Sequence, residues 1–157
     1  MTPAHSRECV GNRGTRPDGI GHGIGKMRIL VVEDEPLLAM LLEESLAELG
    51  HEVVGCAASI DQAMLIMDRV TLDRATIDGA TIDENALDFA LLDFTLADDA
   101  TSAPVAMRLR DDGIPFVYLT GHRSLPLGGD IPVAPLLTKP FTLDQLDEAL
   151  RTVRLAA

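Results

Sequence analysis

The stretch FALLDFTL, residues 89–96, contains a short apolar run that ends at an acid, Asp93. An apolar run of this length, bounded by polar residues, is typical of a buried strand rather than of a helix. A carboxylate costs several kcal/mol to desolvate unless a partner pairs with it. Asp93 therefore lies either at the mouth of a site or in the first exposed position of a loop, and this stretch alone leaves both interpretations open.

The composition limits what the chain can be. Its 157 residues are the length of one domain, and 46% hydrophobic residues with only 3% aromatic ones predict an aliphatic core. A formal net charge of −12 offers no basic surface for nucleic acid or for an anionic membrane. The two cysteines match no zinc spacing, and there is no apolar signal or membrane-spanning run, so a reduced, cytoplasmic setting is expected.

The first 26 residues differ from the rest of the chain. Residues 1–26 are rich in Gly, Pro, Ser and Arg and lack a periodic apolar pattern, which predicts a disordered tail. Their alternating glycines do not make a phosphate-binding loop, because no strand precedes them and no Ser or Thr follows Lys26. The folded domain is expected to comprise residues 27–157.

Outward from Asp93, apolar strand patterns alternate with helical ones. Strands are predicted at 27–34, 52–57, 89–93, 116–120 and 135–140, and helices at 36–49, 59–70, 104–110 and 142–153. Between Gly121 and Pro132, three Gly and two Pro make the fourth of five expected helices degenerate. The alternation predicts an α/β fold with a parallel sheet covered by helices on both faces.

Helix ends and one connection allow finer predictions. Pro36 is placed at a first helical position, Ser102 as an N-cap, and Thr142 with Gln145 as a capping box. Residues 71–85 form an unusually long connection, and three five-residue repeats at 74–88 overlap it, too few for a repeat architecture. The favoured interpretation is an elongated, inserted connection, with a helix extension or a small hairpin as alternatives.

Chemically distinctive residues end the predicted strands. They are Glu33 and Asp34 after the first strand, Asp93, Thr120 and Lys139. Ligands of parallel sheets bind at the carboxyl ends of strands, and clustered carboxylates are relieved by a hard cation such as Mg²⁺. A carboxylate beside Mg²⁺ can attack phosphorus, while an ammonium and a hydroxyl hold the phosphoryl oxygens. Together these positions predict a phosphoryl site around Asp93.

With these motifs the chain resembles the receiver domains of bacterial two-component response regulators, over about residues 27–157. The resemblance rests on Glu33-Asp34 after Ile-Leu-Val-Val, on Leu-Leu-Asp93-Phe-Thr-Leu, on Tyr-Leu-Thr120-Gly121 and on Thr-Lys139-Pro140-Phe141. It implies a doubly wound, five-stranded, flavodoxin-like sheet in the order 2-1-3-4-5.

The resemblance also implies roles for the site residues. Asp93 would accept a phosphoryl group from a sensor histidine kinase or a histidine phosphotransfer protein. Mg²⁺ would be held by Asp34 and Asp93, by Glu33 through water and by the backbone carbonyl of Thr95. The peptide bond between Lys139 and Pro140 would be cis.

Several positions depart from the family's pattern. Leu136 stands where the family often has an aromatic residue that reports phosphorylation. The run around Thr120 partly matches a subgroup with an aromatic-Ala-Thr-Gly motif, common as stand-alone proteins in alphaproteobacteria, but Leu119 replaces the Ala and Arg123 replaces a Tyr. His122 and Thr95 occupy positions that tune hydrolysis of the acyl phosphate in this family.

The leading functional hypothesis is a stand-alone receiver that is not an enzyme and signals through an unknown downstream protein or by passing the phosphoryl group on. The chain ends soon after the last predicted helix, so no output domain is expected. The alternative is an interaction module that works without phosphorylation. An Mg²⁺-dependent phosphatase would need a second acid where Thr95 stands, and is disfavoured.

Overall fold

The computed structural model of the chain describes residues 24–72, 76–77, 80–81, 86–121 and 129–156. The side chains of residues 72–85 are outside this description. The predicted tail lies outside it up to residue 23, as do His122, Arg123 and most of the predicted fourth helix. None of the helices in these ranges is long and apolar enough to cross a membrane.

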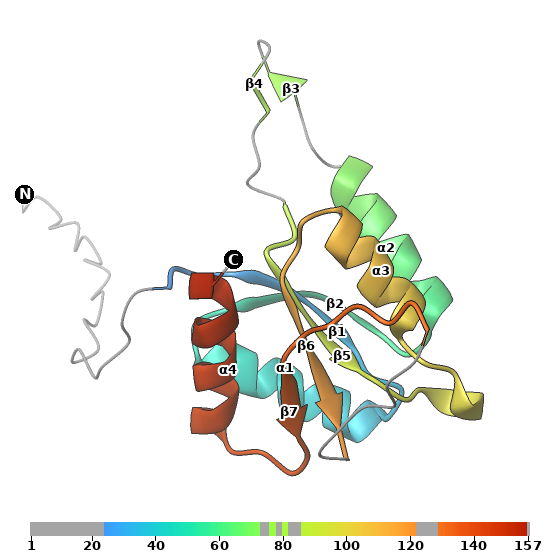
Figure 1. Cartoon of the computed structure of the whole chain (residues 1–157). Coiled ribbons are helices and arrows are strands. Elements are labelled where there is room, and N and C mark those ends of the chain that lie inside the picture. The colour runs from blue at the N-terminus through green and yellow to red at the C-terminus, as the bar shows by residue number, and fades with distance from the viewer. Residues whose placement is uncertain (1–23, 73–75, 78–79, 82–85, 122–128, 157) are drawn as a thin grey trace, which may run out of the picture.

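A parallel, five-stranded sheet forms the centre of the domain (Figure 1). Its strands are β1 (Arg28–Val32), β2 (Glu52–Ala57), β5 (Phe89–Asp93), β6 (Phe116–Thr120) and β7 (Leu136–Thr138), in the order β2-β1-β5-β6-β7. Numbered among themselves, these strands have the order 2-1-3-4-5, so the predicted doubly wound, flavodoxin-like fold is confirmed. Every residue of β5 and β6 is buried, as their unbroken apolar runs require in a sheet covered on both faces.

Helices cover both faces of this sheet (Figure 1). They are α1 (Pro36–Glu48), α2 (Ile60–Leu72), α3 (Ala103–Asp111) and α4 (Leu143–Ala156). One core layer joins the sheet to α2 and α3 and includes Met67 and Leu109. The other joins it to α1 and α4 and includes Leu46 and Leu150. Each fully buried leucine contributes about 1.5–3 kcal/mol through burial, so these apolar stripes orient the helices.

The helix ends confirm two of the three predicted signals. Pro36 opens α1. In the capping box, the backbone N–H of Thr142 donates to Gln145 Oε1 (2.9 Å) and that of Gln145 donates to Thr142 Oγ1 (3.2 Å). Ser102 stands at the N-cap of α3, but its buried hydroxyl makes no capping bond and has no partner. Its φ of −78° and ψ of 9° are not the extended backbone of a capping residue, so that prediction was wrong.

The inserted connection is not merely elongated. Helix α2 continues to Leu72, and β3 (Thr76–Ile77) pairs antiparallel with β4 (Ala80–Thr81) apart from the main sheet. Figure 1 shows this pair projecting from the body of the domain. The small hairpin and the helix extension, the two alternatives, therefore replace the favoured interpretation. Between β6 and β7, the described residues Gly121 and 129–135 form no helix.

Candidate functional site

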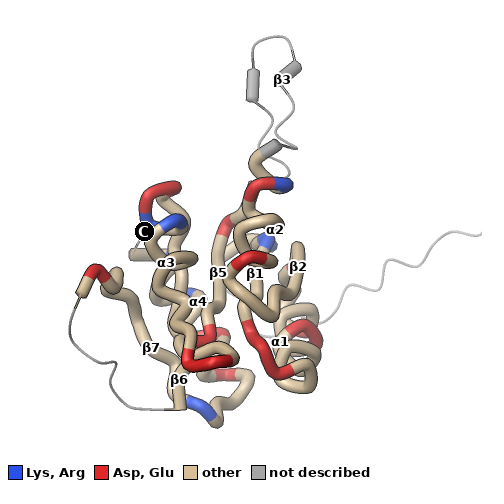
Figure 2. The backbone as a smooth tube through the Cα atoms, turned by 90° about the vertical axis from the view of Figure 1, so that its right-hand side faces the viewer, with Lys and Arg blue, Asp and Glu red and all other residues tan. Residues whose placement is uncertain are grey.

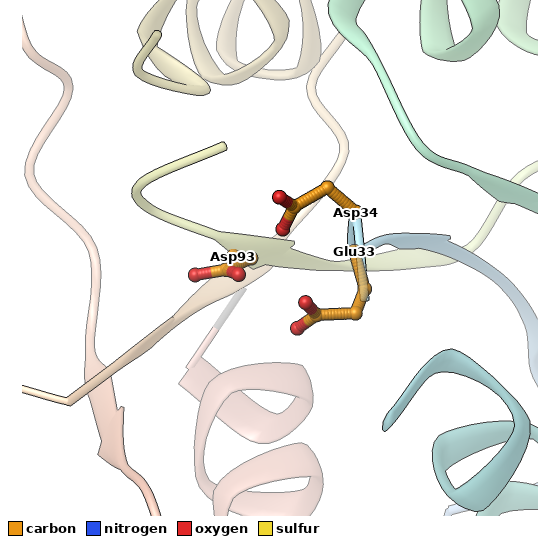
Figure 3. A group of neighbouring side chains, drawn as sticks. All are labelled: Glu33, Asp34 and Asp93. Atoms are coloured by element: carbon orange, nitrogen blue, oxygen red, sulfur yellow. The ribbon is translucent and has the colours of Figure 1, made fainter. Parts of the chain in front are cut away.

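Three carboxylates meet at the carboxyl edge of the sheet (Figure 3). Glu33 and Asp34 follow β1 and Asp93 ends β5, which is the neighbouring strand. One oxygen from each lies within 4.8 Å of the other two. Glu33 is only 3% exposed and Asp93 7%, while Asp34 is half-buried. The predicted acids are thus brought together in a partly enclosed position.

Lys139, which directly follows β7, joins this cluster. Its Nζ lies 3.0 Å from Glu33 Oε2 and 3.1 Å from Asp93 Oδ2. The backbone N–H of Lys139 donates to the carbonyl of Thr120 at 2.8 Å, which fixes the end of β7 against the end of β6. Thr120 is buried beside it, and the peptide bond between Lys139 and Pro140 is cis, as expected. The predicted acids, hydroxyl and ammonium therefore share one edge of the sheet.

The electrostatics of the cluster indicate an excess of negative charge. Burial raises the pKa of Glu33 to about 7, and the charge of Asp93 adds to this rise. Hydrogen bonds from Lys139 and from the backbone N–H of Glu35 (3.1 Å) oppose it. Burial lowers the pKa of Lys139, but its hydrogen bond to Glu33 and the charge of Asp93 outweigh that effect, so its pKa is raised. One ammonium thus faces more carboxylate charge than it neutralises.

This donor set fits a hard divalent cation. All the available ligand atoms are oxygens, and Mg²⁺ is bound in proteins by one or two carboxylates together with water and phosphate oxygens. Acidic residues are spread over the described backbone (Figure 2). In the whole chain, 25 Asp and Glu exceed 13 Lys and Arg. Burial and mutual proximity, rather than charge alone, distinguish Glu33 and Asp93 from the acids of the surface.

Thr95 lies outside the carboxylate cluster. It is exposed, two residues beyond Asp93, and forms a single antiparallel bridge with Thr101. Its role as a carbonyl ligand stays a prediction.

Two features of the site were not predicted from the sequence. One is the direct ion pair between Glu33 and Lys139, which are 106 residues apart. The other is Tyr118, a fully buried residue of β6 whose hydroxyl donates to the carbonyl of Pro132 at 2.8 Å. The sequence signal for Tyr118 is slight: it is the only tyrosine of the chain.

Comparison with known proteins places this geometry in a family. No family model and no curated protein sequence matches the chain, but solved structures do. SdrG from Sphingomonas melonis Fr1 is 35% identical over 82% of this chain and 96% of that one, with a TM-score of 0.59. The BeF3-activated conformation of SdrG from Pseudomonas melonis Fr1 is 33% identical, over 83% and 99%, with a TM-score of 0.58.

The response regulator PhyR from Brucella abortus is also similar, with 28% identity over 84% of this chain and a TM-score of 0.64. The chain spans about half, 49%, of that PhyR. The fold and the strand-end residues define a signal receiver, and these likenesses show that the chain belongs to the response regulator receiver domain family.

Proposed function

We propose that this receiver accepts a phosphoryl group on Asp93 from the phosphohistidine of a sensor histidine kinase or a histidine phosphotransfer protein. The observation that carries the proposal is the position of Lys139, whose Nζ contacts Asp93 Oδ2 at 3.1 Å within the acidic cluster. This ammonium is already located where negative charge increases when a phosphoryl group joins Asp93.

The transfer is a substitution at phosphorus. An oxygen of Asp93 forms the new P–O bond as the P–N bond to the donor imidazole breaks, and the bonding electron pair returns to the imidazole nitrogen, which is protonated from water. The product is an acyl phosphate. Lys139 and the hydroxyl of Thr120 stabilise the charge on the phosphoryl oxygens, because fixed donors at a low-dielectric site need little reorganisation.

Glu33, Asp34 and Asp93 would hold Mg²⁺ at this site, with the carbonyl of Thr95 as the further predicted ligand. When bound, the cation neutralises charge on the phosphoryl oxygens. The carboxylates themselves provide the reason for binding, because one oxygen of each lies within 4.8 Å of the others and, among the residues that the structure describes, Lys139 alone pairs with two of them.

The phosphorylated domain would act as a signalling module and not as an enzyme with a turnover substrate. It would operate in the cytoplasm and signal through protein–protein contact or by passing the phosphoryl group on, without binding nucleic acid or membrane. An interaction module that works without phosphorylation is the alternative, and it gives no reason for burying Glu33 and Asp93 beside one lysine.

The test is chemical phosphorylation followed by intact mass measurement. With acetyl phosphate and Mg²⁺, the wild-type chain should gain one phosphoryl group that hydroxylamine removes, and chelation of Mg²⁺ should prevent the gain. Asp93→Asn should gain none. Asp98→Asn is the matched control, because Asp98 is an exposed acid in the short 3-10 helix η2 (Ala97–Asp99) after β5 and lies outside the cluster. Labelling of Asp93→Asn at the wild-type level would overturn the assignment.

A further inference from the structure

Helix α1 leaves an apolar stripe uncovered beside the candidate site. In the part of the chain that the structure describes, three of the six exposed large hydrophobic side chains belong to this helix: Leu37 is 62% exposed, Met40 47% and Leu41 51%. Their spacing of three and four residues places them on one face of the helix. Exposed apolar groups gathered in this way mark an interaction surface, whereas single exposed leucines need no explanation.

A groove of about 460 Å³ adjoins this stripe, between α1 and the segment that joins β7 to α4. Its apolar lining residues are Leu38, Leu41, Leu42, Pro140 and Phe141. Lys139 also lines the groove, and its Nζ contacts Asp93 Oδ2 at 3.1 Å. Because Leu41 belongs to both the stripe and the groove, the two form one continuous surface, the α1 surface.

The charge of the α1 surface favours a basic occupant. Helix α1 contains no Lys or Arg, and Figure 2 shows acids along it. Exposed Glu44 and Glu48 continue the helical spacing of Leu37 and Leu41, so the stripe changes from apolar to acidic along the helix. In a two-fold dimer the same patch of each copy faces the other, so acids would face acids, which is unfavourable. The occupant should therefore combine apolar with basic side chains.

Residues 1–23 of the same chain have this composition. They contain three Arg against one Glu and one Asp, which gives a net charge of +1; the whole chain has −12, so the remainder carries −13. Val10 and Ile20 lie on either side of Arg13 and Arg16 in the sequence. A segment with so few apolar residues does not bury a core of its own. It gains apolar contact only against an existing surface.

The point where these residues join the domain lies next to α1. Ile24 packs against the core layer that contains α1 and α4. The backbone N–H of Met27 donates to His51 Nδ1 at 3.2 Å, and the backbone N–H of His51 donates to the carbonyl of Leu46, in α1, at 2.9 Å. The chain therefore enters the domain beside the last turn of α1, where Glu48 lies.

Residues 1–23 are long enough to follow the whole helix. The 13 residues of α1 make it about 20 Å long, whereas 23 extended residues span up to about 75 Å. A segment attached to the same chain also has a high effective concentration at a nearby surface, so weak contacts suffice to hold it there.

We propose that residues 1–23 dock on the α1 surface of their own domain, with their arginines toward Glu44 and Glu48 and their apolar side chains in the groove. The docked segment covers the exposed stripe and lies beside Lys139, at the edge of the candidate site. This docking does not depend on the proposed function, because the chain forms it without Mg²⁺ and without a phosphoryl group.

A spin label on Cys9 tests the docking directly. Cys9 and Cys56 are the two cysteines of the chain, so Cys56→Ala leaves one site for a nitroxide. In the ¹⁵N-labelled chain, the nitroxide should broaden the amides of Leu41 and Phe141, and its reduction should restore them. The amide of Leu65 in α2, on the opposite face of the sheet, should stay sharp. Equal broadening on both faces, or none on either, would overturn the proposal.

A mixed sample distinguishes docking within one chain from binding of a second copy. A spin-labelled chain without ¹⁵N is mixed with a ¹⁵N-labelled chain that carries no nitroxide. The amides of Leu41 and Phe141 should then stay sharp. Broadening as strong as in the first sample would assign the α1 surface to a second copy and overturn docking within the chain.

Substitutions on the surface test the apolar contact. Leu37→Ser together with Leu41→Ser changes only exposed positions, so the domain should stay folded, and the broadening of Phe141 should be lost. Leu65→Ser is the matched control, because Leu65 is 65% exposed on α2, and it should leave that broadening unchanged. Broadening at the wild-type level in the folded double variant would overturn the proposal.

Charge reversal in residues 1–23 leaves the folded domain untouched, so it gives a result even if the double serine variant does not fold. Arg13→Glu together with Arg16→Glu sets acids against Glu44 and Glu48 and should also abolish the broadening of Phe141. Broadening at the wild-type level in this variant would overturn the charge complementarity that the docking requires.

Discussion

The two ends of the sheet bury titratable groups in different ways. At the carboxyl end, Glu33 and Asp93 share a single ammonium from Lys139. At the amino end, His51 is 8% exposed and accepts a hydrogen bond at Nδ1 from the backbone N–H of Met27 at 3.2 Å. The histidine is satisfied as a neutral group, whereas the carboxylates keep an excess of charge. This difference supports the proposed ligand site at the carboxyl end, whereas His51 belongs to the structural framework at the amino end.

Added Mg²⁺ should have the largest effect on this comparison, because its proposed ligands lie at the carboxyl end of the sheet. At a free concentration about a hundred times the dissociation constant, a ligand specific for the native state raises the free energy of unfolding by about 2.7 kcal/mol. Urea unfolding with Mg²⁺ and with chelator measures this gain. Asp34→Asn should reduce it and Asp98→Asn should not. A gain that survives in Asp34→Asn would contradict the proposed metal ligands.

Removal of a lysine should distinguish the two ends next. Lys139→Met removes the ammonium from Glu33 and Asp93 and should lower the free energy of unfolding by about 2 kcal/mol in chelator. Its matched control is Lys26→Met. Lys26 pairs with Glu52 at the exposed amino end (3.3 Å), and such a surface pair contributes about 0–1 kcal/mol. Equal losses in urea unfolding would show that the buried pair has no special role.

The pH dependence tests the amino end. Burial lowers the pKa of His51 below its ordinary value of 6.5, against the opposing charge of Asp147 on α4. His51 therefore binds a proton more readily in the unfolded chain than in the folded one. The stability that comes from keeping His51 neutral is complete above pH 6.5, and it is lost as the pH falls from there through the pKa of His51 in the folded chain. The measurement is the free energy of unfolding at about pH 7.5 and at about pH 5.5. Between these two pH values, His51→Gln should lose less stability than the wild type. An identical loss would place the titration elsewhere.

Replacement of Ser102 should have the smallest effect on stability, and its sign should be opposite to that of a lost N-cap. A working N-cap would cost about 1 kcal/mol on replacement by Ala. The buried hydroxyl of Ser102 has no partner, so Ser102→Ala should be neutral or raise the midpoint of thermal unfolding slightly. A clear loss of stability would show that the hydroxyl does cap α3.

The fold was predictable because its signals are local. The apolar runs of β5 and β6, the acids that follow β1 and the capping box at Thr142 are all read within a few residues. The cap at Ser102 failed because its backbone conformation is not extended, and its N–H is bound to the carbonyl of Phe94 at 3.0 Å. A sequence pattern does not include that contact.

The members of the candidate site were predictable in the same way, since each one ends a strand or follows it closely. Their mutual contacts were not. The order of the strands brings Glu33 to Lys139, although 106 residues separate them in the chain. The register between β6 and β7 places Tyr118 beside Leu136. Which charges pair, and which hydroxyl holds residues 129–135, are tertiary properties that depend on the finished sheet.

Direct location of the phosphoryl group tests the central claim most sharply. The chain is phosphorylated by acetyl phosphate with Mg²⁺ and reduced with borohydride, which converts an aspartyl phosphate into homoserine, and its peptides are then sequenced by mass spectrometry. Homoserine should be found at position 93 in the phosphorylated sample and not in a sample treated with chelator. Homoserine at another aspartate, or none in a chain that carries the phosphoryl group, would contradict the assignment of Asp93 as the acceptor.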